Sequence, residues 1–147
     1  MICTVRFQAI DLSLLQLQPA QLADWPEGDE LVARGAVFAQ SEHAYSFVND
    51  KTEIVACAGL LVNHANCMTA WALLSQMVLG DFLAVSRWLR RFHENLVCRR
   101  VDMMVRGSFT NGHQWARLMG FEHEGVQRAW FPDADDLHVY ARVRESV

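Results

Sequence analysis

Two groups of side chains have types and spacings that could bind a metal ion. His64 and Cys67 are separated by two residues, like many paired zinc ligands, but a structural zinc site needs four ligands and no second pair stands at a matching spacing. The acidic stretch 133–136 begins like a calcium loop, yet Leu137 stands where the fifth-position oxygen ligand belongs, and the closing glutamate is missing. We therefore expect no metal cofactor and a hairpin turn after Pro132.

Candidate nucleophiles are equally isolated. Ser75, Ser86 and Cys98 lie outside any Gly-x-Ser-x-Gly sequence and beside no interpretable base. Positions in the core or on a helix surface explain all three side chains, so none of them by itself names a reaction.

The composition is typical of one globular domain spanning residues 1–147. The chain has 52% hydrophobic residues and a formal net charge of −4, so it lacks the broad positive surface that supports nucleic-acid binding. Its longest apolar run, 54–62, is about half the length needed to cross a bilayer. The four cysteines form no Cys-x-x-Cys pair, which suits reduced thiols. We expect a cytoplasmic protein with no nucleic-acid or membrane partner.

The arginine and tryptophan residues are candidates for two binding surfaces, and both have simpler explanations. Arginines gather in the middle of the chain, at positions 87, 90, 91, 99 and 100, and a solvated helix face accounts for them. Trp71, Trp88 and Trp130 could line a cleft. Core packing or a buried partner contact is favoured over base stacking, because the chain is acidic.

Strands and helices must position these residues. The alternating residues 3–10 predict a strand, Asp11 can cap a helix over 12–24, and a second helix is predicted over 28–39.

Three apolar runs follow, separated by turn-forming residues. They cover 43–50, 53–62 and 68–78 and predict an antiparallel meander. The second and third runs are nearly continuous in apolar residues, so we expect central strands covered on both faces.

The clearest amphipathic helix follows Asp81 as its cap, with apolar residues recurring every three or four positions up to Leu96. Strands over 99–105 and 137–143 complete the order βααβββαβαββ. A strand-helix-strand unit requires a parallel pair with a right-handed crossover, whereas the meander is antiparallel. The sheet is therefore predicted to be mixed, with helices on both faces.

The stretch FTNGHQWARLMGFEHEGV, residues 109–126, predicts a short helix and then a strand. Thr110 or Asn111 can accept the unpaired amides at the helix start, and Gln114 can bond back if Asn111 is the cap. Gly120 would end the helix in a left-handed conformation, with the next residue folding back onto it. An asparagine-glycine hairpin is the weaker interpretation, since the following residues have helical periodicity.

The element order and the tail NGHQWARLMGFEHEGV resemble the general N-acetyltransferase (GNAT) superfamily, whose chains end in a helix opened by an asparagine, closed by Gly-Phe and followed by a strand rich in Glu and His. The residues that carry the resemblance are Asn111, Ala116, Leu118, Gly120, Phe121, Glu122 and Gly125. It covers almost the whole chain and is strongest over 68–126. It implies a GNAT-like acyl-CoA N-acyltransferase fold of the α/β class, with a central mixed β-sheet flanked by helices on both faces.

The resemblance also implies acetyl-CoA as cofactor, lying in a gap between the two central parallel strands with its pyrophosphate at the helix start near Asp81. The family's loop has bare glycines at this point, whereas this chain has Gly80 and the carboxylate of Asp81. Arginines at 87, 90 or 91 could pair with the phosphates. The implied cofactor-binding residues are Leu74, Ser75, Gln76, Met77, Val78, Gly80, Arg87 and Asn111.

The family's usual catalytic side chains are replaced. A tyrosine often stands four residues before the Gly-Phe glycine as proton donor, but this chain has Ala116 there, so His113 or a water would have to serve. The family's base is often a glutamate on the strand before the pyrophosphate loop, and the corresponding strand here holds no acid. Glu53, His64 and Glu122 are candidates by element position. The implied catalytic residues are His113 and Glu53.

Two functions follow from the resemblance. In the first, an unknown small-molecule or protein amine attacks acetyl-CoA directly, a reaction that depends mainly on alignment and backbone polarisation. In the second, the chain resembles the catalytically degenerate GNAT-like proteins of tailed bacteriophages, with which it shares the spacing from Trp115 to Gly120, and it acts in the virion through protein–protein contacts. A homodimer or other virion proteins are the corresponding partners.

Overall fold

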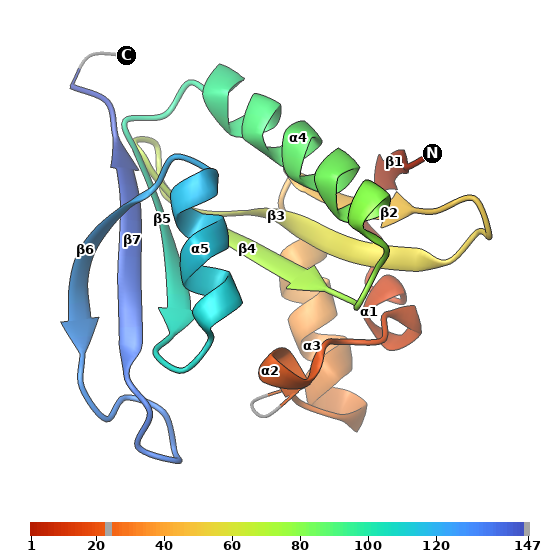
Figure 1. Ribbon diagram of the computed structural model, residues 1–147, viewed down its shortest axis with the longest axis horizontal. Helices are drawn as coiled ribbons and strands as arrows, with labels where there is room; N and C mark the ends of the chain where they lie inside the picture. The colour runs from red at the N-terminus through yellow and green to blue at the C-terminus, as the bar shows by residue number, and fades with distance from the viewer. Residues whose placement is uncertain (23–24, 146–147) are drawn as a thin grey trace. The chain divides into compact units, whose positions relative to one another are not determined.

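The computed structural model describes residues 1–22 and 25–145, which contain seven strands and five helices (Figure 1). The strands are β1 (Cys3–Arg6), β2 (Ala44–Val48), β3 (Ile54–His64), β4 (Cys67–Leu74), β5 (Arg100–Arg106), β6 (Glu122–Gln127) and β7 (Leu137–Val143). The helices are α1 (Asp11–Leu14), α2 (Pro19–Leu22), α3 (Gly28–Ala39), α4 (Leu79–Asn95) and α5 (Thr110–Leu118). The strands form one sheet in the order β1-β2-β3-β4-β5-β7-β6.

The sheet is mixed, as predicted. Strand β4 pairs parallel to β5, whereas β1 with β2, β2 with β3, β5 with β7 and β6 with β7 pair antiparallel. Strands β3 and β4 are neighbours joined by two residues, a connection that only antiparallel strands can use. The predicted meander is therefore confirmed.

The chain divides into two compact units, of which the first comprises residues 1–61 and 71–88. Helices cover both faces of the strands in this unit. On one face, Trp71 of β4 stacks on Phe38 of α3, with ring centroids 4.0 Å apart. On the other face, Trp88 of α4 meets Tyr45 and Phe47 of β2 edge-on, at 4.8 and 5.3 Å. Two of the three tryptophans are thus partly buried, each packed between a helix and the sheet.

The single helix predicted over 12–24 is wrong, because α1 ends after four residues and α2 begins at Pro19. Proline disfavours a helical conformation in the residue before it, which explains the break. Asp11 is the first helical residue rather than the cap, and its Oδ2 accepts a hydrogen bond from the Ser46 hydroxyl at 2.7 Å. Positions 23–24 of the predicted helix lie outside the described residues.

The second unit comprises residues 62–70 and the chain from residue 89 onward. In it, β4 pairs with β5 from Cys67–Arg100 to Ala70–Met103, which confirms the predicted parallel pair. Strands β5, β7 and β6 lie side by side with α5 against one face (Figure 1). The core of this face includes Tyr140, whose side chain is fully buried.

The start of α5 differs from the prediction. Its N-cap residue is Phe109, which makes no side-chain cap bond, and Thr110 and Asn111 are already helical. Gly112 packs against the Phe109 ring: a Cβ at Gly112 would stand 2.5 Å from Cδ2 of Phe109 and 2.9 Å from Cγ1 of Val105. Glycine follows Asn111 because the helix approaches its neighbours closely, and not because the chain reverses there.

The end of α5 matches the prediction. Gly120 has a φ of +92°, its amide donates to the carbonyl of Arg117 at 3.0 Å, and the amide of Phe121 donates to the carbonyl of Ala116 at 3.1 Å. These two bonds form a Schellman motif, in which the residue after the glycine folds back onto the helix. Phe121 is 2% exposed, so the Gly-Phe sequence anchors α5 in the core of its unit.

Helix α4 begins two residues before the predicted cap, so Asp81 lies in its first turn. Strand β4 ends at Leu74, four residues before the predicted end. The segment from 75 to 78 is therefore a short connection between a strand and a helix. None of the helices in the described ranges has the length and apolar character needed to cross a bilayer.

Candidate functional site

A pocket of about 790 Å³ lies in the first unit, where three segments meet. These are the stretch between α1 and α2, the turn between β2 and β3, and the connection from β4 to α4. Its volume is within the range of small-molecule sites. Of the residues predicted from the sequence, Ser75, Gln76, Met77, Val78 and Glu53 line this pocket.

Glu53 is positioned by the turn between β2 and β3. Oδ1 of Asn49 accepts hydrogen bonds from the amides of Lys51 and Glu53, each at 3.0 Å. Nδ2 of Asn49 donates to Oε1 of Glu53 at 3.2 Å. Asparagine favours such turns because its side chain bonds to the following main chain. The Glu53 carboxylate is thus exposed at the pocket with one oxygen engaged.

The connection from β4 to α4 is open on its outer side. Gly80 has no atom within 4 Å of the place where a Cβ would stand, and the side chains of Val78 and Leu79 are 69% and 71% exposed. Leu74, which was also predicted to contact a cofactor, is only 7% exposed. Neither Gly80 nor Leu74 is a lining residue of the pocket.

The charge of the pocket is mainly negative. Asp50, Glu53 and Asp81 line it, whereas Lys51 is the basic side chain among its described lining residues. A carboxylate in the first turn of α4 also offsets the partial positive charge of that helix end. The lining therefore suits an ammonium group better than a phosphate.

The main chain at the end of β4 is bonded to the stretch that contains α2. The amide of Leu74 donates to Oε1 of Gln21 at 2.9 Å, and Nε2 of Gln21 donates to the carbonyl of Ala72 at 2.9 Å. The amide of Gln18 donates to the carbonyl of Leu74 at 3.1 Å. Main-chain groups predicted to grip a cofactor are therefore engaged by the chain itself in this structure.

His113, the predicted proton donor, lies in the second unit between α5 and the sheet. Its Nε2 is 2.9 Å from the carbonyl oxygen of Gly107, and its Nδ1 is 2.7 Å from the hydroxyl of Tyr140. Because a carbonyl only accepts, Nε2 must carry the proton of a neutral imidazole, and Tyr140 then donates to Nδ1. Both ring nitrogens are engaged within the unit.

Two further histidines extend this group across β7 and β6. The rings of His138 and His113 have centroids 4.7 Å apart, and Nδ1 of His138 lies 2.9 Å from Nε2 of His123. Burial, and then the neighbouring His113 and His123, lower the pKa of His138 below its usual value. This cluster was not predicted from the sequence, since its members come from three elements. The alternation of His138 and Tyr140 along β7 was the available signal.

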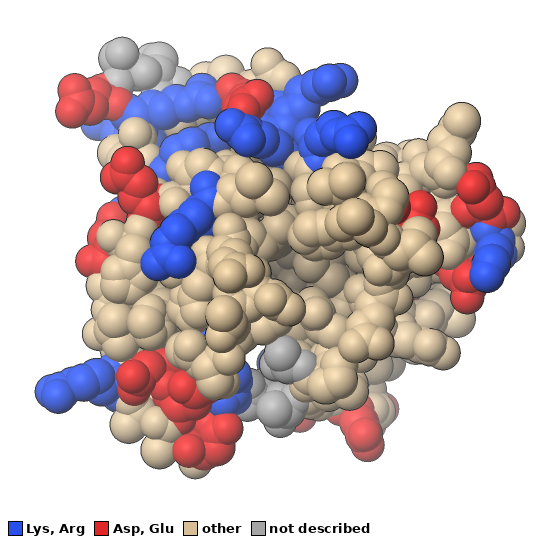
Figure 2. Space-filling model, in the orientation of Figure 1, with Lys and Arg blue, Asp and Glu red and all other residues tan. Residues whose placement is uncertain are grey.

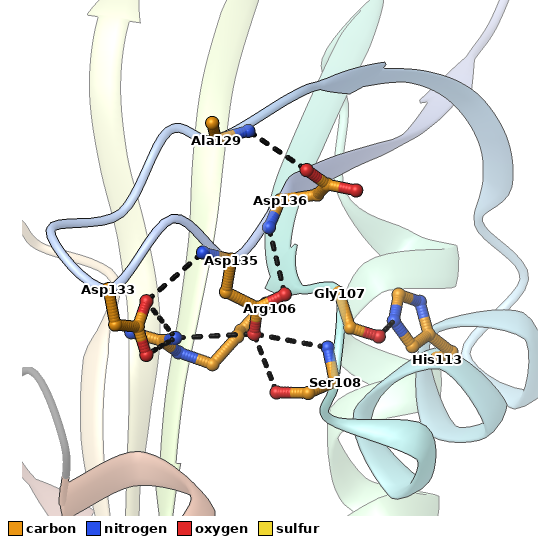
Figure 3. A network of polar contacts seen from close by, with 8 residues as sticks. All are labelled: Arg106, Gly107, Ser108, His113, Ala129, Asp133, Asp135 and Asp136. Atoms are coloured by element: carbon orange, nitrogen blue, oxygen red, sulfur yellow. Dashed lines mark hydrogen bonds and ion pairs between the residues drawn. The ribbon is translucent and has the colours of Figure 1, made fainter.

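Arg106 closes the loop between β6 and β7 (Figure 3). Its Nη1 lies 2.8 Å from Asp133 and 3.2 Å from Asp135, and its guanidinium stands over the Phe131 ring, 3.9 Å from the centroid. The Ser108 hydroxyl donates to Asp135 at 2.6 Å and is the main cause that lowers the pKa of Asp135 to about 2. The acidic stretch 133–136 thus has protein partners.

The loop also confirms the hairpin turn expected near Pro132. The amide of Ala134 donates to the carbonyl of Phe131 at 2.8 Å, which closes a four-residue turn around the proline. Trp130 of this loop is 56% exposed, whereas Trp71 and Trp88 are partly buried.

The remaining predicted residues lie on exposed helix surfaces. Arg87 is exposed on α4 in the first unit, and Asn111 is exposed on α5 in the second. Neither lines the pocket. Exposed arginines of the second unit include Arg90 and Arg91 at the end of α4 and Arg99 before β5, and Figure 2 shows basic side chains gathered at one edge of the face in view.

Metal-ligating side chains are not assembled in the described parts of the chain, where no group of three or more His, Cys, Asp or Glu residues could hold an ion. Nδ1 of His64 accepts from the amide of Asn66 at 3.2 Å, and Sγ of Cys67 lies 3.6 Å from Nδ2 of Asn63. The His64–Cys67 pair belongs to the turn between β3 and β4.

Comparison with known proteins gives matches in structure. No family model and no curated protein matches the chain. A putative phosphinothricin N-acetyltransferase matches with a TM-score of 0.80 at 13% identity, covering 99% of this chain and 100% of that chain. A GNAT superfamily phosphinothricin acetyltransferase from Sinorhizobium meliloti, in complex with AcCoA, matches with a TM-score of 0.74 at 16% identity, covering 99% and 90%.

A chimera of spermidine N-acetyltransferase from Vibrio cholerae and hSSAT matches with a TM-score of 0.73 at 14% identity, covering 97% of this chain and 95% of that chain. At such identities the likeness establishes the fold alone.

Proposed function

Since the chain has the fold of the GNAT acyltransferases, we propose that it is an N-acetyltransferase in which an amine directly attacks the acetyl group of acetyl-CoA. The observation that carries this proposal is the pairing of β4 parallel to β5, with α4 as the crossover between them. The family resemblance implies that the cofactor lies between these two parallel strands. The AcCoA complex of a structural neighbour adds support.

The residues of this chain fit such a cofactor in part. The backbone at Gly80 is open to solvent, and the exposed side chains of Val78 and Leu79 beside it offer apolar surface that a ligand would cover. Asp81 opposes a pyrophosphate by charge, and the amide of Leu74 is occupied by Gln21. We propose that main-chain groups from Leu74 to Gly80 hold the cofactor, which would supply the acyl thioester.

The acceptor amine belongs, in this proposal, to the pocket of the first unit. The carboxylates of Asp50, Glu53 and Asp81 attract an ammonium group. Glu53 is our candidate for removing its proton, because its carboxylate lines the pocket and the side-chain amide of Asn49 bonds to one of its two oxygens, Oε1. Among named activities of structural neighbours, spermidine acetylation suits this charge best. A polyamine is therefore the first acceptor to try.

His113 has a more demanding role than the sequence suggested. Its one proton in the neutral state is bonded to the carbonyl of Gly107. Donation of that proton to a leaving thiolate would require the imidazole to release Gly107. Proton transfer from water is the simpler route, since alignment of amine and thioester provides much of the rate.

A thermal-shift titration with acetyl-CoA tests the proposal. Binding to the folded state should raise the melting temperature by mass action, corresponding to about 2.7 kcal/mol at one hundred times the Kd. Gly80→Trp should weaken the shift if the loop is placed correctly, and Gly125→Trp is the matched control, since Gly125 also has open space around it. Spermidine with acetyl-CoA should then release free thiol.

Absence of any shift at millimolar acetyl-CoA would reject the enzymatic proposal. That result would favour a GNAT-fold protein that acts through protein–protein contacts. A shift that Gly80→Trp leaves unchanged would retain the cofactor and reject our placement of its loop.

A further inference from the structure

The side chain of Gln21 occupies a main-chain edge that a ligand could otherwise use. The amide of Arg100 donates to the carbonyl of Asn66 at 3.0 Å. The even-numbered residues at the start of β4 therefore direct their main-chain N–H and C=O groups toward β5. Because successive strand residues alternate in direction, the main-chain groups of Ala72 and Leu74 lie on the same edge of β4 as those of Ala70, which belongs to the last parallel pair.

Gln21 fills this edge as an added strand would. Its amide donates to the carbonyl of Ala72 and accepts from the amide of Leu74, both at 2.9 Å. The orientation of the side-chain amide is determined, because a carbonyl can only accept and an N–H can only donate. Gln18 supports it, with its own amide bonded to the carbonyl of Leu74 at 3.1 Å and its side chain 3.4 Å from Oε1 of Gln21.

We propose that Gln21 is a gate: its side-chain amide closes the Ala72–Leu74 edge of β4, and an acyl-CoA must displace it to bind. This inference rests on the proposed acetyltransferase function. The pantetheine arm of coenzyme A contains secondary amides, each of which offers one N–H donor and one carbonyl acceptor. The N–H and the carbonyl of one trans amide point in opposite directions, so two successive amides of the arm are needed. The N–H of one donates to the carbonyl of Ala72 and the carbonyl of the next accepts from the amide of Leu74, as in an added strand, which replaces both bonds of Gln21.

The segment that carries the gate is suited to moving. Helix α2 has only four residues, and it is preceded by Leu15 in an extended conformation, with φ −82° and ψ 127°. A helix this short has little stability of its own and depends on its contacts. The side chain of Gln21 and the ligand therefore compete for the same two hydrogen-bonding groups of β4, and this competition decides whether the edge is open.

Isothermal titration of acetyl-CoA into the wild type and the Gln21→Ala variant measures the gate. Removing the competing side chain should lower the apparent Kd about tenfold, since a site that is closed most of the time binds in proportion to its open fraction. Gln40→Ala is the matched control, because Gln40 is an exposed glutamine at the end of α3. Its Kd should equal that of the wild type.

Amide hydrogen exchange at Leu74 supplies a readout that does not depend on activity. In the free protein, the Leu74 amide should exchange faster in Gln21→Ala than in the wild type, and acetyl-CoA should restore its protection in the variant. Gln21→Glu retains the side-chain length and replaces the donor facing Ala72 with an acceptor, so it should also open the edge. Gln21→Glu replaces Gln21→Ala in both measurements if the alanine variant does not fold.

The outcomes separate the gate from the proposed function. Equal acetyl-CoA affinity in the wild type and both Gln21 variants would overturn the gate while the cofactor site stands. Loss of affinity in Gln21→Ala would also overturn it, since the side chain would then be part of the site. If no variant binds acetyl-CoA, the proposed function fails and the gate fails with it, leaving Gln21 as a structural cap of the β4 edge.

Discussion

The imidazole of His113 accepts a hydrogen bond from the buried hydroxyl of Tyr140, with 2.7 Å between Nδ1 and the oxygen. The other ring nitrogen, Nε2, bonds to the carbonyl of Gly107. One histidine thus ties helix α5 to strand β7 and to the end of β5. Its neutral tautomer is fixed by these two partners.

Removing the hydroxyl in Tyr140→Phe should destabilise the protein by about 1–2 kcal/mol, because a ring nitrogen of His113 would lose its donor in a half-buried place. Chemical denaturation of Tyr140→Phe, His113→Ala and the double variant measures the coupling of the pair. The loss in the double variant should be smaller than the sum of the single losses. Strictly additive losses would contradict the bond.

Acid should destabilise the protein through His93. This side chain is 5% exposed, and burial, followed by the charge of Arg142, lowers its pKa to about 4. The unfolded histidine, with a pKa near 6.5, therefore takes up a proton first as the pH falls. The stabilising contribution is complete above pH 6.5 and is lost toward pH 4, by about 3 kcal/mol.

Denaturation of the wild type and His93→Gln between pH 7 and 4.5 checks this prediction. The variant should show a flatter pH dependence, since glutamine does not titrate. The remaining slope in this window should include His138, whose pKa is lowered as well. Parallel curves for the two proteins would show that His93 is not held neutral.

Two glycines with open space around them, Gly80 and Gly120, should respond differently to alanine. A Cβ at either Gly80 or Gly120 meets nothing within 4 Å, but Gly120 has a φ of +92°. Gly120→Ala should cost about 1–2 kcal/mol of unfolding free energy, because an L-residue is strained there. Gly80→Ala should leave stability within about 0.5 kcal/mol of the wild type. Equal melting temperatures of the two variants would argue against the Schellman end of α5.

The loop between β6 and β7 should loosen when the guanidinium of Arg106 is removed. Arg106→Met keeps an aliphatic stem but loses the contacts with Asp133 and Asp135. The amide of Ala129, which donates to Asp136 in the same loop at 2.9 Å, should exchange about tenfold faster. Arg128→Met is the control, because Arg128 is exposed in this loop and its replacement should have no effect.

The cysteines should differ widely in reactivity. Cys57 is fully buried, and burial raises its pKa from 9.0 to about 12, so its thiolate fraction is about a thousandfold below that of an ordinary thiol. Cys3 is exposed. In a labelling experiment at pH 8 read by mass spectrometry, Cys3 should react first and Cys57 only on unfolding. Early modification of Cys57 in Cys3→Ser would contradict its burial.

Helices and strands with strong local patterns could be predicted from the sequence. The bounds of α3 match the predicted range 28–39, and Gly120 ends α5 as expected. These features depend on residues that are neighbours in the chain. The interruption between α1 and α2 escaped prediction, because the apolar periodicity before Pro19 continues through the break and the bond from Gln18 to Leu74 joins distant segments.

The candidate site, too, has features that could be predicted from the sequence and features that could not. The turn composition around Asn49 placed Glu53 next to a strand end, and the family resemblance placed cofactor-binding residues at 75–78, although the apolar pattern had predicted that the strand continues to residue 78. Their shared pocket could not be predicted, because it also needs the stretch between α1 and α2. The histidine cluster was missed for a similar reason, since three separate elements supply it.

The sequence by itself determined the fold class, the parallel crossover around α4 and the glycine that ends α5, because these follow from hydrophobic periodicity and backbone conformations that act over a few residues. Only the tertiary structure decided that Gln21 bonds to β4 and that His113 bonds to Tyr140. A hydrogen-bonding side chain can serve many partners, and the partner it finds depends on how segments that are distant in the chain are brought together.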